Sequence, residues 1–308
     1  MTTYSPVRAD HALIVIPTCN GHKDLERLLD SLPDGYPLYV IDSSSSDGTQ
    51  ELLAERGIDH RVIPKHEFNH GGTRRQATRD RPGYDVYLYL TQDAYLASPD
   101  AIERLLAYVD DPEVGAVCGR QLPHLDANPL AAHARHFNYP AESQVKSRED
   151  VARLGLKVAF MSNSFAAYRA RALEEVGGFP DDVILAEDMY VAARMIQHGW
   201  KIAYAGDACC HHSHNYTLGE EFRRYFDIGV FHACQPWIQQ ELGGAGGEGR
   251  RFVLSEWRYL GLAHLGWWPV ALGATAMKLA GYKLGKQHAR LPGRLRRAFS
   301  MHKGFWKH

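Results

Sequence analysis

Short apolar runs alternate with segments of helical periodicity along the first part of the chain. Continuous apolar runs predict strands that are buried on both faces. Such strands are predicted at residues 12–17, 37–42, 60–64, 84–91 and 114–119. Between them, apolar residues recur at helical spacing, first at Leu25, Leu28, Leu29 and Leu32 and later at Ile102, Leu105, Leu106 and Val109. A shorter helix is predicted at residues 50–57.

Beyond residue 120 the alternation is less regular. The pattern predicts an extended segment at residues 157–169, a helix at 187–199 and a strand from residue 201 towards 214. Strands that alternate with helices imply right-handed crossovers and a mainly parallel, Rossmann-like sheet flanked by helices. The sequence therefore predicts an α/β fold whose ligands gather at the carboxyl ends of the strands.

Charge is distributed unevenly along this chain of 308 residues, although the formal net charge is only −1. The segment after Glu256 contains ten Lys or Arg residues and no carboxylate, whereas residues 1–256 carry −11. Such a tail calls for an anionic partner or surface. Nucleic-acid binding is disfavoured, because the basic residues are confined to the tail and match no recognition motif.

Cysteine usage and the N-terminal residues both indicate a cytosolic protein. The five cysteines are scattered, with one adjacent pair, and suggest no disulfide framework. Asp10 precedes only a short apolar run, so we expect neither a signal peptide nor a membrane span there.

Polar residues cluster at the ends of the predicted strands and at the start of one helix. These clusters are Thr18 to Asn20, Asp42 to Asp47, Gln92 with Asp93, and Glu187 with Asp188. A single carboxylate in such a place is often only a helix cap. Four clusters on one rim of a sheet favour a binding site instead.

The segment FNHGGTRR, which begins at Phe68, allows two interpretations. It is either a polar surface loop or a turn whose bare backbone lets an anion approach the start of a helix.

Several motifs resemble one known family in order and spacing. PTCN at Pro17, DSSSSDGT at Asp42, LTQDA at Leu90 and AED at Ala186 resemble the inverting glycosyltransferases of family 2, which have the GT-A fold. FNHGGTRR and HSHNYT at His212 are similar to the bacterial rhamnosyltransferase branch, as is the tail from Leu284 to Trp306. The resemblance covers nearly the whole chain, and FNHGGTRR is its most specific motif.

The resemblance implies a pocket for a nucleotide diphosphate sugar. Asp42 would pair with the base or ribose, in a pocket also lined by Pro17, Thr18 and Asn20. Gly71 and Gly72 would permit close backbone approach while Arg74 meets the phosphate charge. Asn69 and His70 would contact the nucleotide or fix the turn. Other expected contacts of the nucleotide sugar are Gln92 and Arg224, of which Arg224 could instead belong to a solvated charged face.

The resemblance also implies a divalent metal, Mg²⁺ or Mn²⁺, held by Asp93 and His212, with His214 as a nearby metal or substrate contact. Thr91 and Gln92 stand where the family often has a further carboxylate, so we expect the metal to bind mainly with the nucleotide present. Zinc is disfavoured, because the spacing of CCHHSHN (residues 209–215) matches no zinc motif.

Asp188 matches the family's general base, with Glu187 as the second candidate. The start of a helix would favour the ionised carboxylate that accepts the proton of the acceptor hydroxyl. The alternative is an ordinary carboxylate at a helix N-terminus.

The predicted domains are a GT-A catalytic domain at residues 1–250 and a helical, basic extension at 251–308. His264, Pro269 and Lys278 interrupt the apolar stretch 252–282, which argues against a transmembrane helix. This stretch either lies on anionic lipid, with Trp267 and Trp268 at the interface, or packs on the catalytic domain or a second subunit.

Taken together, the sequence predicts a metal-dependent inverting rhamnosyltransferase. It would use dTDP-β-L-rhamnose to extend a cell-surface glycan precursor, with a lipid-linked acceptor at the cytoplasmic face of the plasma membrane. The alternatives are another UDP- or dTDP-sugar donor on the same fold, and a non-catalytic nucleotide- or glycan-binding module.

Overall fold

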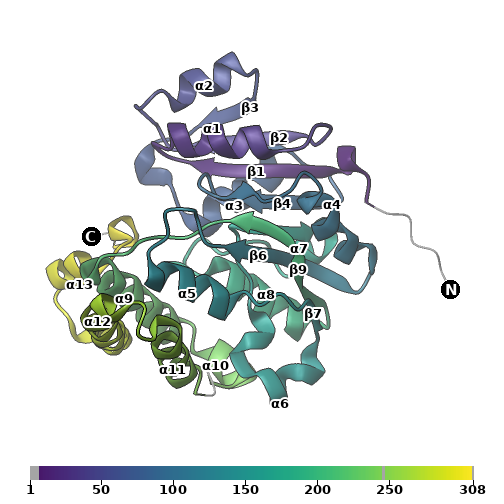
Figure 1. Ribbon diagram of the computed structural model, residues 1–308. Coiled ribbons are helices and arrows are strands. Elements are labelled where there is room, and N and C mark those ends of the chain that lie inside the picture. Colours follow the sequence, from purple (N-terminus) through teal and green to yellow (C-terminus); the bar gives the residue numbers. More distant parts are fainter. Residues whose placement is uncertain (1–6, 245–246, 307–308) are drawn as a thin grey trace.

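A single mixed sheet organises the chain in the computed structural model, which describes residues 7–244 and 247–306 (Figure 1). The described residues form nine strands in the order β3-β2-β1-β4-β8-β6-β9-β5, with β7 paired to β9. The strands are β1 (Ala12–Thr18), β2 (Leu38–Asp42), β3 (Asp59–Val62), β4 (Val86–Leu90), β5 (Tyr95–Leu96), β6 (Val114–Leu122), β7 (Gln144–Lys146), β8 (Phe165–Arg169) and β9 (Lys201–His211).

The two halves of the sheet differ in strand direction. Strands β3, β2, β1 and β4 are parallel, whereas β8 runs antiparallel to both of its neighbours, β4 and β6. Strand β9 is parallel to β6. The carboxyl ends of β1, β2, β4, β6 and β9 therefore meet the start of β8 at one edge. The second half contains more antiparallel pairing than the alternation of elements indicated.

Helices flank both faces of the sheet and continue into a C-terminal bundle. They are α1 (His22–Ser31), α2 (Thr49–Glu55), α3 (His70–Asp80), α4 (Ala101–Leu106), α5 (Pro129–Asn138), α6 (Val151–Leu154), α7 (Ala170–Glu175), α8 (Glu187–Gln197), α9 (Leu218–Cys234), α10 (Pro236–Leu242), α11 (Glu248–Leu260), α12 (Trp268–Lys286) and α13 (Gly293–Phe299). Figure 1 shows α9, α11, α12 and α13 gathered below the sheet.

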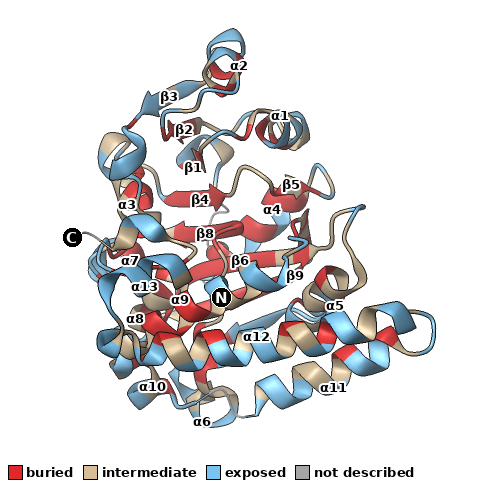
Figure 2. Cartoon of the chain, turned by 90° about the vertical axis from the view of Figure 1, so that its left-hand side faces the viewer, coloured by how far each residue is buried: buried red, intermediate tan, exposed pale blue. Residues whose placement is uncertain are grey.

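The apolar runs become strands that are buried on both faces. In β1, Leu13 and Val15 belong to the core on one face, while Ile14 and Ile16 belong to the core on the other. Successive side chains of a strand point to opposite faces, so a continuous apolar run suits a sheet covered on both sides. Figure 2 shows the strands largely buried beneath helices whose outer sides are exposed.

The expectation of extended chain over residues 157–169 is wrong in its first half. Residues Gly155–Ala159 form a 3₁₀ helix, and the strand begins only at Phe165. The buried ammonium group of Lys146 donates to the carbonyl oxygens of Lys157 and Phe160, each at 3.2 Å. These two carbonyl groups are thus paired with a side chain and not with a neighbouring strand. An apolar run does not distinguish a buried helical turn from a strand.

The C-terminal extension packs on the rest of the chain through glycines. Helix α12 crosses α9 so closely that a Cβ atom at Gly229, Gly281 or Gly285 would collide with a carbonyl oxygen of the facing helix. An ion pair between Lys278 and Glu221 (3.2 Å) also joins the two helices. No helix within residues 7–244 and 247–306 is long and apolar enough to cross a bilayer.

Candidate active site

A cleft of about 1330 Å³ opens at the carboxyl ends of β1, β2 and β4. The strand ends contribute Pro17, Thr18, Ser43, Thr91 and Gln92 to its lining. Gln92 joins β1 to β4, because its Oε1 accepts hydrogen bonds from the Thr18 hydroxyl (2.6 Å) and from the Cys19 backbone N–H (2.8 Å). The remaining walls are the start of α3 and a segment near the C-terminus.

Asp42 and Asn20 hold the loops at this edge and do not line the cleft. Asp42 is fully buried, and its carboxylate accepts from the Ser45 backbone N–H and from Gln50, each at 2.9 Å. The Asn20 side chain accepts from the Ser46 N–H (2.9 Å). Local turns therefore already use both side chains, whereas Pro17 and Thr18 line the cleft as expected. The contact of Asp42 and Asn20 with a nucleotide stays a prediction.

Backbone strain among the described residues gathers at the same edge. Positive φ angles outside glycine occur at Asn20 (49°), Ser44 (55°) and Ala186 (60°), which lie beside β1, beside β2 and directly before α8. Such conformations cost about 1–3 kcal/mol each and concentrate at functional sites. The strain supports a functional role for this edge of the sheet.

The start of α3 shows which of the two expected roles Asn69 has in the protein itself, and what Gly71 contacts. Asn69 is the N-cap of α3, and its side chain accepts from the Gly72 N–H at 2.8 Å. Gly71 is buried, and a Cβ there would collide with the Pro180 carbonyl oxygen. Glycine is therefore required at 71 by protein packing, not by a ligand. Gly72, His70 and Asn69 line the cleft.

Arg74 forms a buried ion pair with Glu187. The guanidinium Nη1 lies 3.0 Å from Glu187 Oε1, and both side chains are almost inaccessible. Asn163 also donates to this carboxylate, at 2.8 Å. Burial alone would raise the pKa of Glu187, but the charge of Arg74, together with the Asn163 hydrogen bond, holds the pKa below its ordinary value. The negative charge that Arg74 meets is thus Glu187, although Arg74 also lines the cleft.

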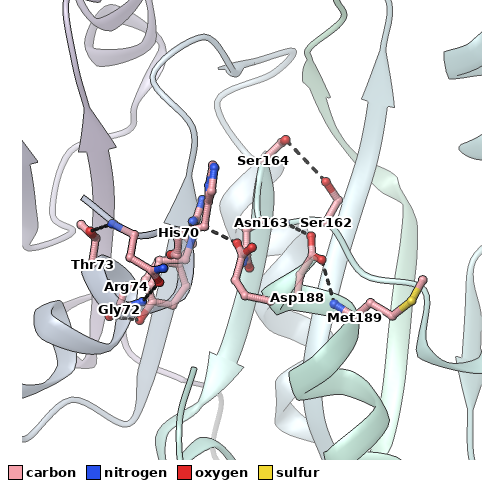
Figure 3. Close-up of polar contacts among 12 residues, drawn as sticks. His70, Gly72, Thr73, Arg74, Ser162, Asn163, Ser164, Asp188 and Met189 are labelled. Atoms are coloured by element: carbon pink, nitrogen blue, oxygen red, sulfur yellow. Dashed lines mark hydrogen bonds and ion pairs between the residues drawn. The ribbon is translucent and has the colours of Figure 1, made fainter. Parts of the chain in front are cut away.

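Asp188 is the more accessible of the two neighbouring carboxylates. One of its oxygens accepts from the Met189 N–H (2.7 Å) and the other from the Asn163 N–H (3.2 Å) (Figure 3). Burial, and then the charge of Glu187, raise the pKa of Asp188 to about 7. The hydrogen bonds at the helix start favour the ionised form, as expected, but burial and the charge of Glu187 outweigh them. A pKa near 7 suits a general base at neutral pH.

Asp93, His212 and His214 form the one group among the described residues whose geometry suits a metal ion. Asp93 Oδ2 lies 3.4 Å from His212 Nε2 and 3.7 Å from His214 Nε2. Burial would raise the pKa of Asp93, but the two imidazoles lower it below its usual range. Burial, followed by the charge of His212, lowers the pKa of His214 to about 4. One ionised carboxylate and two neutral imidazoles are a fitting donor set for a divalent cation.

Gln121 orients His212 and was not anticipated from the sequence. Its Oε1 lies 2.9 Å from His212 Nδ1, which leaves Nε2 directed towards Asp93. Gln121 also donates to the Ser162 hydroxyl (2.7 Å), and the next residue, Asn163, holds Asp188 and Glu187. These contacts place the metal-binding group and the candidate base on one hydrogen-bonded network.

Arg224 lies on the exposed side of α9, with its guanidinium 5.7 Å from the Tyr216 ring. Its charge helps to lower the pKa of both His214 and His70, after the larger effect of burial. The contact of Arg224 with phosphate stays a prediction.

Comparison with known proteins shows close relatives along the whole chain. The family described as glycosyl transferase family group 2 matches residues 88–280. The chain is 53% identical to the O-antigen chain rhamnosyltransferase RfbN of Salmonella typhimurium, over 95% of each protein. It is 54% identical to the O-antigen chain rhamnosyltransferase WbaN of Salmonella anatum, over 87% of this chain and 85% of the relative.

Solved structures show the same fold at low sequence identity. A mannosyltransferase from Pyrobaculum calidifontis, in complex with GDP-Man and Mn²⁺, aligns with a TM-score of 0.57 and 20% identity, over 98% of this chain and 87% of that protein. The TarS fragment 1–349 of S. aureus with UDP-GlcNAc aligns with a TM-score of 0.54 and 13% identity, over 91% of each. These likenesses confirm the predicted GT-A fold.

The adjacent residues Glu187 and Asp188 should differ sharply in their effect on stability. We expect Glu187→Gln to lower the free energy of unfolding by about 3–5 kcal/mol, because it leaves the buried Arg74 charge unpaired. The matched variant Asp188→Asn keeps the acceptor for Met189 and should change that free energy by less than about 1 kcal/mol. Urea unfolding at pH 8 measures both values, and equal losses would contradict the assigned role of the ion pair.

Proposed function

This chain belongs to glycosyl transferase family group 2, and from that premise we propose that it is a metal-dependent inverting rhamnosyltransferase. It moves L-rhamnose from dTDP-β-L-rhamnose to a hydroxyl of a cell-surface glycan precursor. The observation that carries this proposal is the 53% identity, over 95% of both chains, to a protein that extends an O-antigen with rhamnose. The acceptor in this proposal is a lipid-linked glycan.

The nucleotide diphosphate of the donor binds in the cleft at the ends of β1, β2 and β4. Pro17, Thr18 and Gln92 line one side, while His70, Gly72 and Arg74 line the other. The N-terminus of α3 directs its positive dipole end towards this space. The cleft thus offers both a polar floor and positive charge for a dinegative diphosphate.

Asp188 accepts the proton of the acceptor hydroxyl. As the O–H bond breaks, the acceptor oxygen forms a bond to the anomeric carbon, and the bond from that carbon to the diphosphate breaks on the opposite side. The configuration at the anomeric carbon inverts, and the diphosphate leaves with the electron pair. Glu187 stays ionised against Arg74, and its nearby charge makes Asp188 a stronger base.

Asp93, His212 and His214 are the residues that would hold a divalent cation. When bound, such a cation would stabilise the negative charge on the departing diphosphate. Imidazole nitrogen is a poorer ligand for Mg²⁺ than for Mn²⁺, because Mg²⁺ strongly prefers oxygen. Two imidazoles in a set of three therefore favour Mn²⁺ over Mg²⁺.

The outer surface of the C-terminal bundle supports a peripheral position on the cytoplasmic face of the membrane. Leu262 and Leu265, in the connection between α11 and α12, are 84% and 57% exposed. Other exposed apolar side chains on these helices are Leu254, Trp257, Val270, Leu272, Met277 and Leu279. Apolar side chains next to a basic tail suit a surface of anionic lipid.

Donor and metal preference test the proposed reaction directly. Sugar transfer from a panel of nucleotide sugars into a glycolipid extract should be fastest with dTDP-β-L-rhamnose and Mn²⁺, slower with Mg²⁺ and absent with EDTA. His212→Ala should abolish the metal response, whereas His211→Ala, on the neighbouring residue outside the metal group, should keep it. Faster transfer from a UDP-sugar would support the alternative donor, and binding of dTDP without transfer from any donor would favour the non-catalytic module.

The pH profile tests the role of Asp188. The carboxyl must be ionised to accept a proton, so kcat/KM should fall about tenfold per pH unit below about 7 and level off above it. Asp188→Asn should keep its affinity for dTDP and lose transfer by a factor of about 10² to 10⁴. Unchanged turnover in this variant would refute the assignment of the base.

Vesicle binding tests the membrane proposal. The double substitution Leu262→Ser and Leu265→Ser should weaken binding to phosphatidylglycerol vesicles, as measured by sedimentation, and high salt should weaken it further. Val62→Ser, in β3 at the far edge of the sheet, is the control, because Val62 is also exposed (45%). Equal binding of all three proteins would remove the support for a lipid contact at α11 and α12.

A further inference from the structure

The segment Ser300–Trp306, here called the C-terminal strap, forms one wall of the cleft at the sheet edge. Its residues Met301 to Phe305 line the cleft together with the start of α3. The strap lies more than 200 positions from α3 in the chain, so its place there depends on contacts with the C-terminal bundle. Neither the sequence motifs nor the family match, which ends at residue 280, assigns it a role.

Asp227 of α9 fixes the strap. This carboxylate is fully buried, and one of its oxygens accepts from the backbone N–H groups of Met301 (2.9 Å) and His302 (3.0 Å). Aromatic contacts hold both ends, since Phe299 packs on Phe222 and Trp306 packs on Phe226. A buried carboxylate with two backbone donors defines the position of His302 closely.

The imidazole of His302 meets that of His70 across the cleft wall. His302 Nδ1 and His70 Nε2 share a hydrogen bond of 3.2 Å, and the rings are nearly perpendicular, with centroids 4.6 Å apart. Burial lowers the pKa of both rings, that of His302 to about 3. Two neutral imidazoles can share only one proton in this bond. The ring that accepts this bond carries its own proton on its second nitrogen, which is Nε2 in His302 or Nδ1 in His70. The pair therefore keeps one further N–H group that can donate to a ligand.

The surroundings of this pair point to an anionic ligand. Arg74, which is 4% exposed, lines the same cleft, and its Nε has no hydrogen-bond partner among the described residues. The other charged residues that line the cleft are basic (Lys65, Arg75, Arg79 and Lys303) and acidic (Glu67, Asp80, Asp181 and Asp182), and Arg75 is paired with Asp181. The histidine pair, Arg74 and the N-terminus of α3 all line this one cleft, and N–H donors of these kinds suit phosphate oxygens.

We propose that His302 is a donor-binding residue, which together with His70 binds the diphosphate of the nucleotide sugar, and that Asp227 is the positioning residue that holds it there. This inference rests on the proposed function, since it concerns the same donor. It makes the C-terminal strap part of the donor site and gives the distant end of the chain a direct role in substrate binding.

Calorimetric binding of dTDP, UDP and thymidine in the presence of Mn²⁺ tests the proposal. We expect His302→Ala to raise the Kd of the bound diphosphate about tenfold or more, because a hydrogen bond to a charged group is lost. The Kd of thymidine, which has no phosphate, should not change. His288→Ala is the matched control, since the His288 ring also contacts Trp306 in the tail but does not line the cleft.

Two further variants separate binding from folding. His302→Gln keeps a side-chain donor and should retain most of the affinity even if His302→Ala folds poorly. Asp227→Ala should weaken dTDP binding as much as His302→Ala does, and the double variant should bind only slightly more weakly than either single variant. Asp227→Asn keeps an acceptor oxygen for the strap and should therefore retain dTDP binding.

The outcomes distinguish this proposal from the proposed function. If the wild-type protein binds UDP in place of dTDP, the proposed donor identity is refuted. The ratio of the Kd values of His302→Ala and wild type for the bound diphosphate still tests the role of His302. Equal affinity of the two proteins for the diphosphate, or an equal loss for thymidine and dTDP, would overturn the role of His302.

Discussion

The buried ion pair between Arg74 and Glu187 is the interaction on which the rest of the site depends. Arg74 belongs to α3, which connects the parallel strands β3 and β4, and Glu187 begins α8, which follows the antiparallel strand β8. The pair therefore joins the two halves of the sheet at the edge where they meet. Gly71 reinforces the contact, because only glycine lets the first turn of α3 approach the Pro180 carbonyl. A buried pair adds little net stability, but it fixes geometry strictly, since either charge alone would be costly there.

That geometry gives two adjacent carboxylates different properties. Glu187 stays ionised because Arg74 balances its charge. Asp188 has no cation in direct contact among the described residues, and burial and the charge of Glu187 raise its pKa. Environments that separate the pKa values of paired carboxylates are typical of enzymes that need a base at neutral pH. The αL conformation of Ala186 directly precedes both residues and sets the direction in which they leave the backbone.

The sequence predicted those parts of the molecule that depend on local pattern. Apolar runs located β1, β2 and β4, and the family resemblance grouped Asp93 with His212 and His214, which the structure brings together. Patterns of this kind do not show which neighbour a side chain meets. Asp42 accepts hydrogen bonds within its own turn, and Gly71 packs against the Pro180 carbonyl. Gln121 and His302 contact histidines that are far away in the chain. These roles depend on strand pairing and helix packing that no local motif encodes.

The basic tail consists of three parts that have different surroundings in the structure. Its charge alone indicated only an anionic partner. Glycines of α12 press against α9, the exposed leucines between α11 and α12 face outwards, and the strap returns to the cleft through Asp227. Helix α9 carries both Gly229, against which α12 packs, and Asp227, which holds the backbone of His302 and lies two residues earlier in the same helix. The helix that anchors the extension is thus also the helix that positions the strap, which links the outer surface of the bundle to the wall of the cleft.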